Sequence, residues 1–431
     1  MNLLEKLGEI WGGANHPFLI YKNIEIFFCD ITNQSPIDLS NIHKGDVVAI
    51  IGDFNPPSIL TLLRLIDIGV VIVPLTNETK FEHEYFFEAA LVDIVIDGSK
   101  VIRRNHYQKN KFIEKLRDLE HAGLVLFSSG TTNRPKAILH DLTIFLKRFE
   151  TPRHSFRTLN FLLFDHIGGI NTLLHTLFNK GVVVAPESRS VDSILDTCRR
   201  YRVEVLPTTP TFLRMMLMSG AVPRKVPNCL KVITYGTERM DQPTLDHLSS
   251  QLPDVDFRQT FGMSELGIVR VKSEARNSLY MKIGGEGIET RIVGGVLHIR
   301  SKSRMVGYLN APCPFDDEGW YDTKDIVEVK GNLYKVTGRI SELINVGGLK
   351  FMASEVERVA LDFPSISMVK AVAKQNPITG QHVELIVQPK ANYIIDKTEL
   401  MAYLKKNLQI HMVPKRINIE SIAIGHRFKK A

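Results

Sequence analysis

Apolar runs alternate with amphipathic stretches in the first part of the chain. From Asp46 the sequence reads DVVAIIGDFNPPSILTLLRLIDIGVVIVPLT, in which an apolar run, a Gly/Asn/Pro break, an amphipathic stretch and a second β-branched run follow each other. This order predicts a strand, a helix and a second strand joined by a parallel crossover. Similar alternation recurs in residues 161–184 and 203–235, with TFLRMML and DSILDTCRRY as helices between apolar strands. The basic, polar segment 99–121 predicts a surface helix. The pattern as a whole indicates an α/β fold with a largely parallel sheet.

The pattern changes after about Glu286, where short alternating runs are separated by glycine turns. TRIVGGVLHIRSK and IVEVKGNLYKVTGR predict antiparallel hairpins, so we expect a β-rich subdomain to begin there. Beyond Arg339 the order is helix 353–362, strand 367–374, strand 383–389 and helix 397–408. We therefore expect a large domain of mixed, mostly parallel sheets packed with helices in residues 1–338. A small, mobile α+β domain follows in residues 339–431.

Composition fits this picture of a multidomain globular protein. The chain has 431 residues, of which 44% are hydrophobic and 23% charged, which predicts two or more domains. Its apolar runs are far shorter than the ~20 residues that span a bilayer. The amino terminus lacks the order of a secretory signal, so we expect a cytoplasmic protein. The four cysteines form no CxxC pair, which predicts free thiols and no structural zinc.

Positive charge is concentrated near the carboxy terminus. The net charge is +7, and from Arg339 to the end 14 Lys and Arg stand against 8 Asp and Glu. This favours a polyanionic ligand or an acidic partner, although a solvated basic surface without a ligand has the same composition. No interleaving of aromatic and basic residues accompanies the charge, so nucleic acid is not an expected partner.

One segment combines an apolar strand with a turn rich in hydroxyls and glycine. Residues 124–136 read LVLFSSGTTNRPK, and the turn closes on Lys136. Its backbone N–H groups and four hydroxyls can ring an anion, while Lys136 supplies a positive charge. The segment is not a Walker P-loop, because GxxxxGK[ST] is absent. Segments of this composition also form ordinary surface loops.

The order and spacing of this turn resemble the phosphate-binding signature SGTTGxPKG of the adenylate-forming superfamily. That superfamily contains acyl- and aryl-CoA synthetases, peptide-synthetase adenylation domains and luciferases. Two of its glycines are replaced, by Asn133 and Ala137. Asparagine tolerates positive φ, so the turn at Asn133 can survive. The resemblance implies that the nucleotide phosphates lie against Ser128, Ser129, Gly130, Thr131, Thr132 and Lys136.

Further elements of the same superfamily follow in order. Residues 259–265, QTFGMSE, resemble its YGxTE element, and residues 235–238, YGTE, stand where it has an adenine-contacting turn. The resemblance implies that Phe261 packs on adenine, Ser264 touches the α-phosphate and Glu265 holds Mg²⁺, a hard cation that prefers oxygen ligands. The remaining nucleotide contacts implied here are Gly236, Thr237, Glu238 and Gly262.

Two more elements complete the resemblance. GWYDTKD, residues 319–325, is similar to the GWxxTGD element, with Lys324 in place of a glycine and Asp325 as the ribose ligand. Gly338-Arg339 and the segments that follow resemble the hinge block of the superfamily. Arg339 would then reach the ribose or a phosphate, and Ser341 lies at the expected pivot of the small domain. Together these matches run from about Asp46 to the carboxy terminus.

The superfamily completes adenylation with a lysine near its carboxy terminus, where negative charge redistributes between carboxylate and phosphate. The usual PxTxxGK text is missing here, and the end reads IAIGHRFKKA. Alignment on Gly425 puts His426 at the catalytic position. Counting from Pro414 gives Lys430, which we prefer, with Lys429 second and His426 third. A basic tail without a catalytic role is the alternative.

The acid-binding segment is expected at residues 164–171, FDHIGGIN. By resemblance His166 gates the substrate carboxylate, although it could also be an ordinary loop histidine. Asp165 raises the option of an amino-acid substrate, because adenylation domains for amino acids place an aspartate nearby to bind the ammonium group. The register between the two residues is open by one position.

The resemblance implies an ATP-dependent carboxylic acid ligase. It would form an acyl-adenylate and pyrophosphate with Mg²⁺, and then transfer the acyl group to a thiol. The thiol is coenzyme A or the phosphopantetheine of an acyl or peptidyl carrier protein, and the other expected partner is a small carboxylic acid. Two alternatives stay open: a catalytically degenerate adenylate-binding protein and an amino-acid adenylation enzyme.

Overall fold

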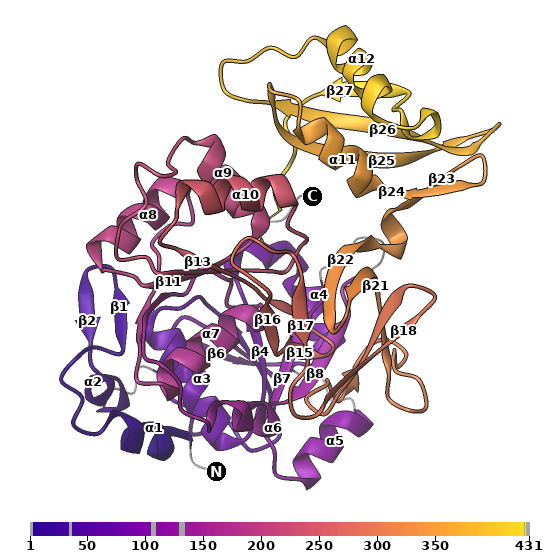
Figure 1. Ribbon diagram of the computed structural model, residues 1–431. Coiled ribbons are helices and arrows are strands. Elements are labelled where there is room, and N and C mark those ends of the chain that lie inside the picture. Colours follow the sequence, from indigo (N-terminus) through magenta and orange to yellow (C-terminus); the bar gives the residue numbers. More distant parts are fainter. Residues whose placement is uncertain (1–2, 34–36, 105–108, 129–133, 426, 428–431) are drawn as a thin grey trace.

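The structure is a computed structural model that describes residues 3–33, 37–104, 109–128, 134–425 and 427. Figure 1 shows a large part built from sheets and helices, with a small unit of strands and helices at one end. This arrangement confirms the predicted fold class. None of the helices in the described ranges has the length and apolar character needed to cross a bilayer.

The first large sheet contains the predicted crossover unit from Asp46. Strand β3 pairs in parallel with β4 and β5, β4 pairs in parallel with β7, and helix α3 connects β3 to β4. Asn55 caps the first turn of α3, and Gly69 ends the helix with φ 82°. The order across the sheet is β20 (Gly307–Tyr308), β8 (Ala137–Asp141), β7 (Gly123–Phe127), β4 (Val71–Leu75), β3 (Val47–Ile51), β5 (Ile94–Asp97) and β6 (Lys100–Arg103). Its helices are α3 (Pro56–Ile68), η1 (Asn77–Glu82), α4 (His83–Ala90), α5 (Lys111–Asp118), α6 (Leu142–Leu146) and η2 (Lys147–Phe149).

The second large sheet is parallel except for its last strand. Its order is β13 (Asp256–Gln259), β12 (Val232–Tyr235), β11 (Val205–Thr208), β9 (Arg157–Leu159), β10 (Val182–Val184), β1 (Leu19–Tyr21) and β2 (Ile24–Ile26). Its helices are α7 (Ile167–Phe178), α8 (Val191–Arg200), α9 (Pro210–Met218) and α10 (Gln242–Gln251), while α1 (Leu3–Trp11) and α2 (Phe28–Asn33) open the chain. Leu62 of α3 and Leu173 of α7 belong to one apolar core that includes strands of both sheets. The two sheets are therefore held together through these helices.

An antiparallel sheet follows, as the glycine-separated runs predicted. It contains β16 (Val271–Ser273), β17 (Met281–Ile283), β22 (Leu333–Arg339), β21 (Tyr321–Lys330), β19 (Val296–Ser301) and β18 (Ile288–Val293), and β14 (Phe261–Met263) pairs with β15 (Gly267–Val269) beside it. The predicted start near Glu286 was wrong, because β16 and β17 already belong to this sheet through the β17–β22 pair. These two strands are three residues long and polar in part, so they leave no alternating run in the sequence.

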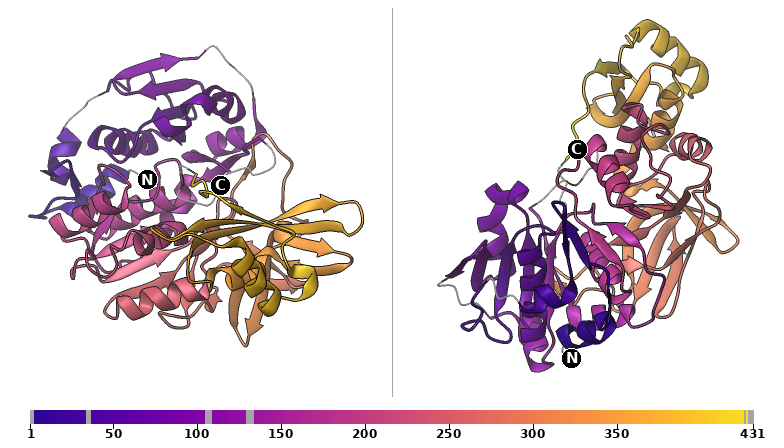
Figure 2. Two further views of the ribbon diagram at one scale, coloured as in Figure 1. Left: turned by 90° about the horizontal axis from the view of Figure 1, so that it is seen from above. Right: turned by 90° about the vertical axis from the view of Figure 1, so that its left-hand side faces the viewer.

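The carboxy-terminal unit has its own sheet and its own apolar core. It contains η3 (Ile340–Glu342), β23 (Leu343–Val346), β24 (Leu349–Met352), α11 (Ala353–Leu361), β25 (Ile366–Asn376), β26 (Gly380–Pro389), α12 (Lys397–Asn407), η4 (Ile410–Met412) and β27 (Arg416–Ile419). The predicted helix–strand–strand–helix order is confirmed. After β27 the chain leaves this unit and returns toward the large part, as the right-hand view in Figure 2 shows.

Candidate functional site

The hydroxyl-rich turn joins two paired strands at one edge of the first sheet. The backbone N–H of Ser128 donates to the carbonyl oxygen of Lys136 at 3.1 Å, and the N–H of Lys136 donates to Ser128 Oγ at 3.0 Å. These two bonds close the base of the turn directly after β7 and before β8. The predicted phosphate contacts Ser129, Gly130, Thr131 and Thr132 lie outside the described residues, as does Asn133.

Lys136 and Glu265 meet through the ring of Tyr308. The Lys136 Nζ atom lies 4.8 Å from the ring centre, and Tyr308 Oη donates to Glu265 Oε1 at 2.7 Å. Burial and the neighbouring Glu265 carboxylate raise the pKa of Tyr308, so the phenol keeps its proton and remains a donor. The structure thus brings the end of the turn and the QTFGMSE element to one place.

Two backbone contacts fix the segment that carries Ser264 and Glu265. The Nε2–H of His140, on β8, donates to the carbonyl oxygen of Ser264 at 2.6 Å, and the N–H of Met305 donates to the carbonyl oxygen of Glu265 at 2.8 Å. Burial lowers the pKa of His140 to about 4, so its ring is neutral at pH 7. Both contacts hold the segment against the edge of the first sheet.

Asp325 and Arg339 face each other across strands β21 and β22. Arg339 Nε donates to Asp325 Oδ1 at 2.8 Å, and Asp325 is only 4% exposed. Burial raises the pKa of Asp325, while the Arg339 charge opposes the shift. Tyr321 connects this ion pair to Tyr308, with which it forms a hydrogen bond. The charges of Glu265, Arg339 and Asp325 all act on the pKa of its phenol. The site elements from four distant parts of the sequence therefore form one contiguous group.

Lys324 keeps a backbone conformation that normally belongs to glycine. Its φ is 62°, in the left-handed region, directly before Asp325. A non-glycine residue there costs roughly 1–2 kcal/mol. The lysine that replaces the superfamily glycine therefore leaves the local backbone shape in place at some cost in strain.

A cavity of about 350 Å³ lies between α7, the second sheet and β14. Four predicted site residues line it: His166, Thr237, Phe261 and Gly262. His166 caps α7, where its Nδ1 accepts a hydrogen bond from the N–H of Gly168 at 3.0 Å. In the neutral ring the proton is then on Nε2.

The three residues 236–238 of the YGTE turn have different surroundings. A Cβ on Gly236 would lie 2.1 Å from Thr260 Oγ1, so only glycine fits there. Thr237, with φ 70°, lines the cavity, but the Glu238 carboxylate accepts from the N–H of Thr211 at 2.6 Å at the start of α9. Glu238 thus has a structural partner, which sequence resemblance alone does not reveal.

Arg427 is a site residue that sequence reasoning missed. Its Nη1 donates to the carbonyl oxygen of Phe127 at 3.2 Å, and its Nη2 lies 3.4 Å from Asp165 Oδ2. Phe127 precedes the hydroxyl-rich turn and Asp165 precedes His166, so Arg427 enters between the two halves of the site. The alignment on Gly425 could have indicated Arg427, because it puts the catalytic position of the tail directly after Gly425. The predicted Lys429 and Lys430, and His426, lie outside the described residues.

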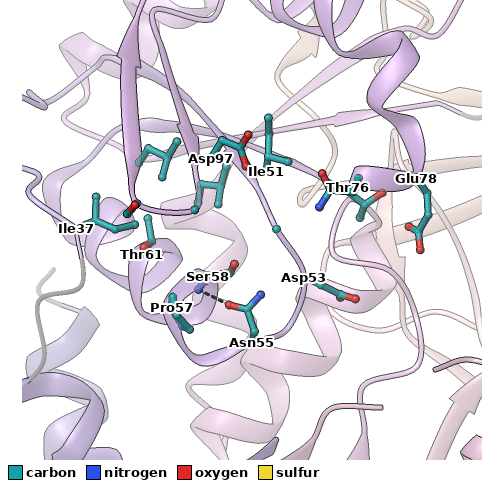
Figure 3. Close-up of a pocket in the computed structure, with 16 residues that line it drawn as sticks. Ile37, Ile51, Asp53, Asn55, Pro57, Ser58, Thr61, Thr76, Glu78 and Asp97 are labelled. Carbon is teal, nitrogen blue, oxygen red and sulfur yellow. Dashed lines mark hydrogen bonds between the residues drawn. The ribbon is translucent and has the colours of Figure 1, made fainter. Parts of the chain in front are cut away.

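A second cavity, of about 630 Å³, lies at the carboxyl ends of β3, β4 and β5 (Figure 3). Parallel sheets often bind ligands at this edge. The residues that line it include Asp53, Glu78 and Asp97 but no Lys or Arg. Asp53 is paired with Arg189 at 3.1 Å. An acidic lining does not suit a polyanion, and none of the predicted site residues lines this second cavity.

Comparison with known proteins defines the class. The two-part fold and the clustered turn, carboxylates and cavity are those of an adenylate-forming protein, and residues 38–308 match the family model described as AMP-binding enzyme. The chain therefore belongs to the AMP-binding enzyme family, which confirms the resemblance described above.

Curated relatives are distant. The 4-coumarate–CoA ligase 4 of Arabidopsis thaliana is 24% identical over 317 residues, which cover 65% of this chain and 55% of that enzyme. This chain thus spans about half the length of that relative. The 2-succinylbenzoate–CoA ligase of Listeria monocytogenes is 25% identical over 414 residues, covering 88% of this chain and 85% of the relative.

Solved structures share the fold at low identity. The anthranilate CoA ligase AuaEII in complex with anthranoyl-AMP superposes with a TM-score of 0.81 and 16% identity, covering 100% of this chain and 95% of the other. ATP-bound MatB from Rhodopseudomonas palustris gives 0.80 and 17%, covering 99% and 97%. At these identities the likeness concerns the fold.

Proposed function

We propose that the chain is an ATP-dependent carboxylic acid ligase that forms an acyl-adenylate and transfers the acyl group to coenzyme A. The observation that carries this proposal is the contact of Lys136 and Glu265 through Tyr308, continued through Tyr321 to Asp325. A cationic turn, a carboxylate for a metal and a buried carboxylate for a sugar are the groups that a metal nucleotide requires. The names of the relatives, CoA ligases for aromatic acids, point in the same direction.

The nucleotide would lie along this group. Lys136 supplies positive charge to the phosphates together with the hydroxyl-rich turn, and Asp325, held by Arg339, accepts hydrogen bonds from the ribose hydroxyls. Phe261 and Thr237, at the boundary between the nucleotide group and the cavity, would contact the adenine. Support for ATP as the substrate comes from the ATP-bound neighbour of similar fold.

Magnesium fits the same place. Glu265 presents a carboxylate whose orientation Tyr308 fixes at 2.7 Å, and the described part of the chain holds no group of three His, Cys, Asp or Glu that could bind a metal by itself. Mg²⁺ typically uses one or two carboxylates and takes its other ligands from phosphates and water. When bound, it would neutralise charge on the phosphates.

In the first step a carboxylate oxygen of the acid attacks the α-phosphorus, the new O–P bond forms, and the bond to pyrophosphate breaks. The chain's task is to hold nucleophile and phosphorus in line and to exclude water. His166, with its proton on Nε2, donates to the acid from the cavity side. Arg427 fixes the tail against Phe127 and Asp165 on the other side.

The second step needs access for the thiol. We assign residues 1–338 to the nucleotide- and acid-binding domain and residues 339–431 to a small domain that rotates about Ser341. The basic small domain, with 14 Lys and Arg against 8 Asp and Glu, suits the phosphates of coenzyme A and also an acidic carrier protein. Coenzyme A is the acceptor that the relatives' names favour.

The acid is not an amino acid in this proposal. Asp165 is 4% exposed and pairs with Arg427, so its charge is already matched and an ammonium group would have to displace the arginine. Substrates with an amino group therefore serve as a contrast in the assay below.

ATP–pyrophosphate exchange tests the proposal with a panel of aryl, fatty and amino acids. We expect exchange with at least one acid, and a loss of about 100-fold in Glu265→Gln and Asp325→Asn, because each removes a charge that stabilises bound nucleotide. Asp192→Asn, which breaks an exposed ion pair with Lys225, is the matched control. ATP binding without exchange for any acid would support the catalytically degenerate protein instead.

A further inference from the structure

The cavity of about 350 Å³, in which we place the acid substrate, runs along one face of α7. The helix contributes His166, Gly168, Thr172 and His175 to its lining, at intervals of two to four residues. The two histidines are nine positions apart, which corresponds to about 13–14 Å along a helix. His166 lies at the start of α7, where the adenylated carboxylate is expected, and His175 lies near the end of the same helix.

The ionisable residues that line the cavity are all basic. They are Arg153, Arg258, His166 and His175, with no aspartate or glutamate among the lining residues. Arg258 Nε is paired with Asp256 at 2.6 Å. Arg153 has no ion pair in the described part of the chain. An unmatched cation therefore belongs to the cavity.

The surroundings of Arg153 are also positive. Burial lowers the pKa of His175, and the charge of Arg153 lowers it further. The pKa of Arg148 is also lowered, to about 10, first by burial and then by the charges of Arg153 and Arg270. Positive groups therefore repel each other at this end, where no aspartate or glutamate is among the described lining residues, and an anion would relieve that repulsion.

Hydroxyl groups line the walls of the cavity. The lining threonines are Thr158, Thr172, Thr176, Thr208, Thr234, Thr237 and Thr260. The hydroxyl oxygen of Thr208 is buried and has no hydrogen-bond partner among the described residues. An unsatisfied buried hydroxyl is costly, so an acid that brings further oxygen atoms into the cavity is favoured over one that ends in a methyl group.

We propose that the acid substrate carries a second carboxylate, which Arg153 binds at the end of the cavity far from His166. This inference rests on the proposed ligase function and narrows its substrate class to dicarboxylic acids. Arg153 is a specificity-determining residue in this scheme. The other carboxylate, at His166, is the one that is adenylated.

The test compares α,ω-dicarboxylates of four to ten carbons with the monocarboxylates of equal length in pyrophosphate exchange. For the best chain length we expect the dicarboxylate to exceed its monocarboxylate in kcat/KM by roughly fivefold or more, since Arg153 is exposed and an exposed ion pair contributes about 1 kcal/mol. Arg153→Met should reduce this ratio to about one, and Arg153→Lys should retain part of it. Arg200→Met, an exposed arginine outside the cavity, is the matched control and should keep the ratio.

Binding of the same acids, measured by titration calorimetry, separates two kinds of failure. Equal affinity or equal kcat/KM for both acid series in the unmodified protein, or an unchanged ratio in Arg153→Met, would overturn the inference. Absence of exchange together with an Arg153-dependent preference for dicarboxylates in binding would instead contradict the ligase function and leave the cavity assignment supported.

Discussion

Arg427 offers the sharpest test of how the tail contributes to adenylation. Its guanidinium bridges the carbonyl oxygen of Phe127 at 3.2 Å and Asp165 Oδ2 at 3.4 Å, and its side chain is 13% exposed, against 5% for Asp165. Arg427→Gln removes the charge and leaves the carboxylate buried and unpaired. Breaking such a pair typically costs about 3–5 kcal/mol. The tail can leave the site and expose Asp165 to water, so we take the lower end, about 3 kcal/mol.

A cost of about 3 kcal/mol corresponds to roughly a 100-fold slower adenylation. The assay is pyrophosphate exchange, and thioester formation from chemically prepared acyl-adenylate reports the second step separately. We expect the rate of pyrophosphate exchange to fall and the rate of thioester formation to change little, because only adenylation needs the tail in place. Arg427→Lys keeps the charge but loses one of the two contacts, so its loss should be roughly tenfold.

A double-mutant cycle isolates the ion pair. Because Asp165→Asn removes the same interaction, the variant with both changes should lose little more than Arg427→Gln alone. Arg416→Gln, an exposed arginine of β27, is the matched control, and thermal unfolding of each variant checks the fold. Full exchange activity in Arg427→Gln, or independent losses from the two single changes, would refute the reasoning.

Three further outcomes follow from individual contacts. Burial lowers the pKa of His140 to about 4 from an ordinary value of 6.5, so on acidification the unfolded chain binds this proton before the folded chain does. The free energy of unfolding is therefore highest above pH 6.5 and falls by up to about 3 kcal/mol as the pH drops toward 4. Urea unfolding should show that His140→Gln, which can still donate to Ser264, reduces this slope; an unchanged slope would exclude His140 as its cause. Tyr308→Phe keeps the ring beside Lys136 but loses the hydroxyl, so the KM for Mg·ATP should rise about tenfold. Lys324→Gly should raise the free energy of unfolding by about 1 kcal/mol, whereas equal or lower stability would argue against strain at that position.

The regular elements were predictable where the period of apolar residues is long. Helix α3 and strands β3 and β4 follow from the pattern after Asp46, and helix α11 with strands β25 and β26 follows from that after Arg339. The short strands were harder, since β16 and β17 have three residues each and depend on partners that are distant in sequence. Local pattern cannot specify such partners.

The candidate site shows the same division. The motifs around Lys136, Glu265 and Asp325 were found because their residue order is local. Tyr308 belongs to no motif, and Tyr321 lies inside the GWYDTKD element without a predicted role. The position of both rings depends on the pairing of β20 with β8 and of β21 with β19. The tail contact depended on a choice of register. Lys430, which counting from Pro414 favoured, lies outside the described residues and stays a prediction. The tail contact found in the structure is made by Arg427, two residues after Gly425.

The most direct measurement of the central claim is a crystal structure of the chain with ATP and magnesium. The account predicts the triphosphate against Lys136 and the hydroxyl-rich turn, the metal on Glu265 and the ribose hydroxyls on Asp325, all on one nucleotide. A nucleotide bound in the cavity of Figure 3, which Asp53, Glu78 and Asp97 line, would contradict the account. So would a nucleotide that contacts none of the side chains of Lys136, Glu265 and Asp325.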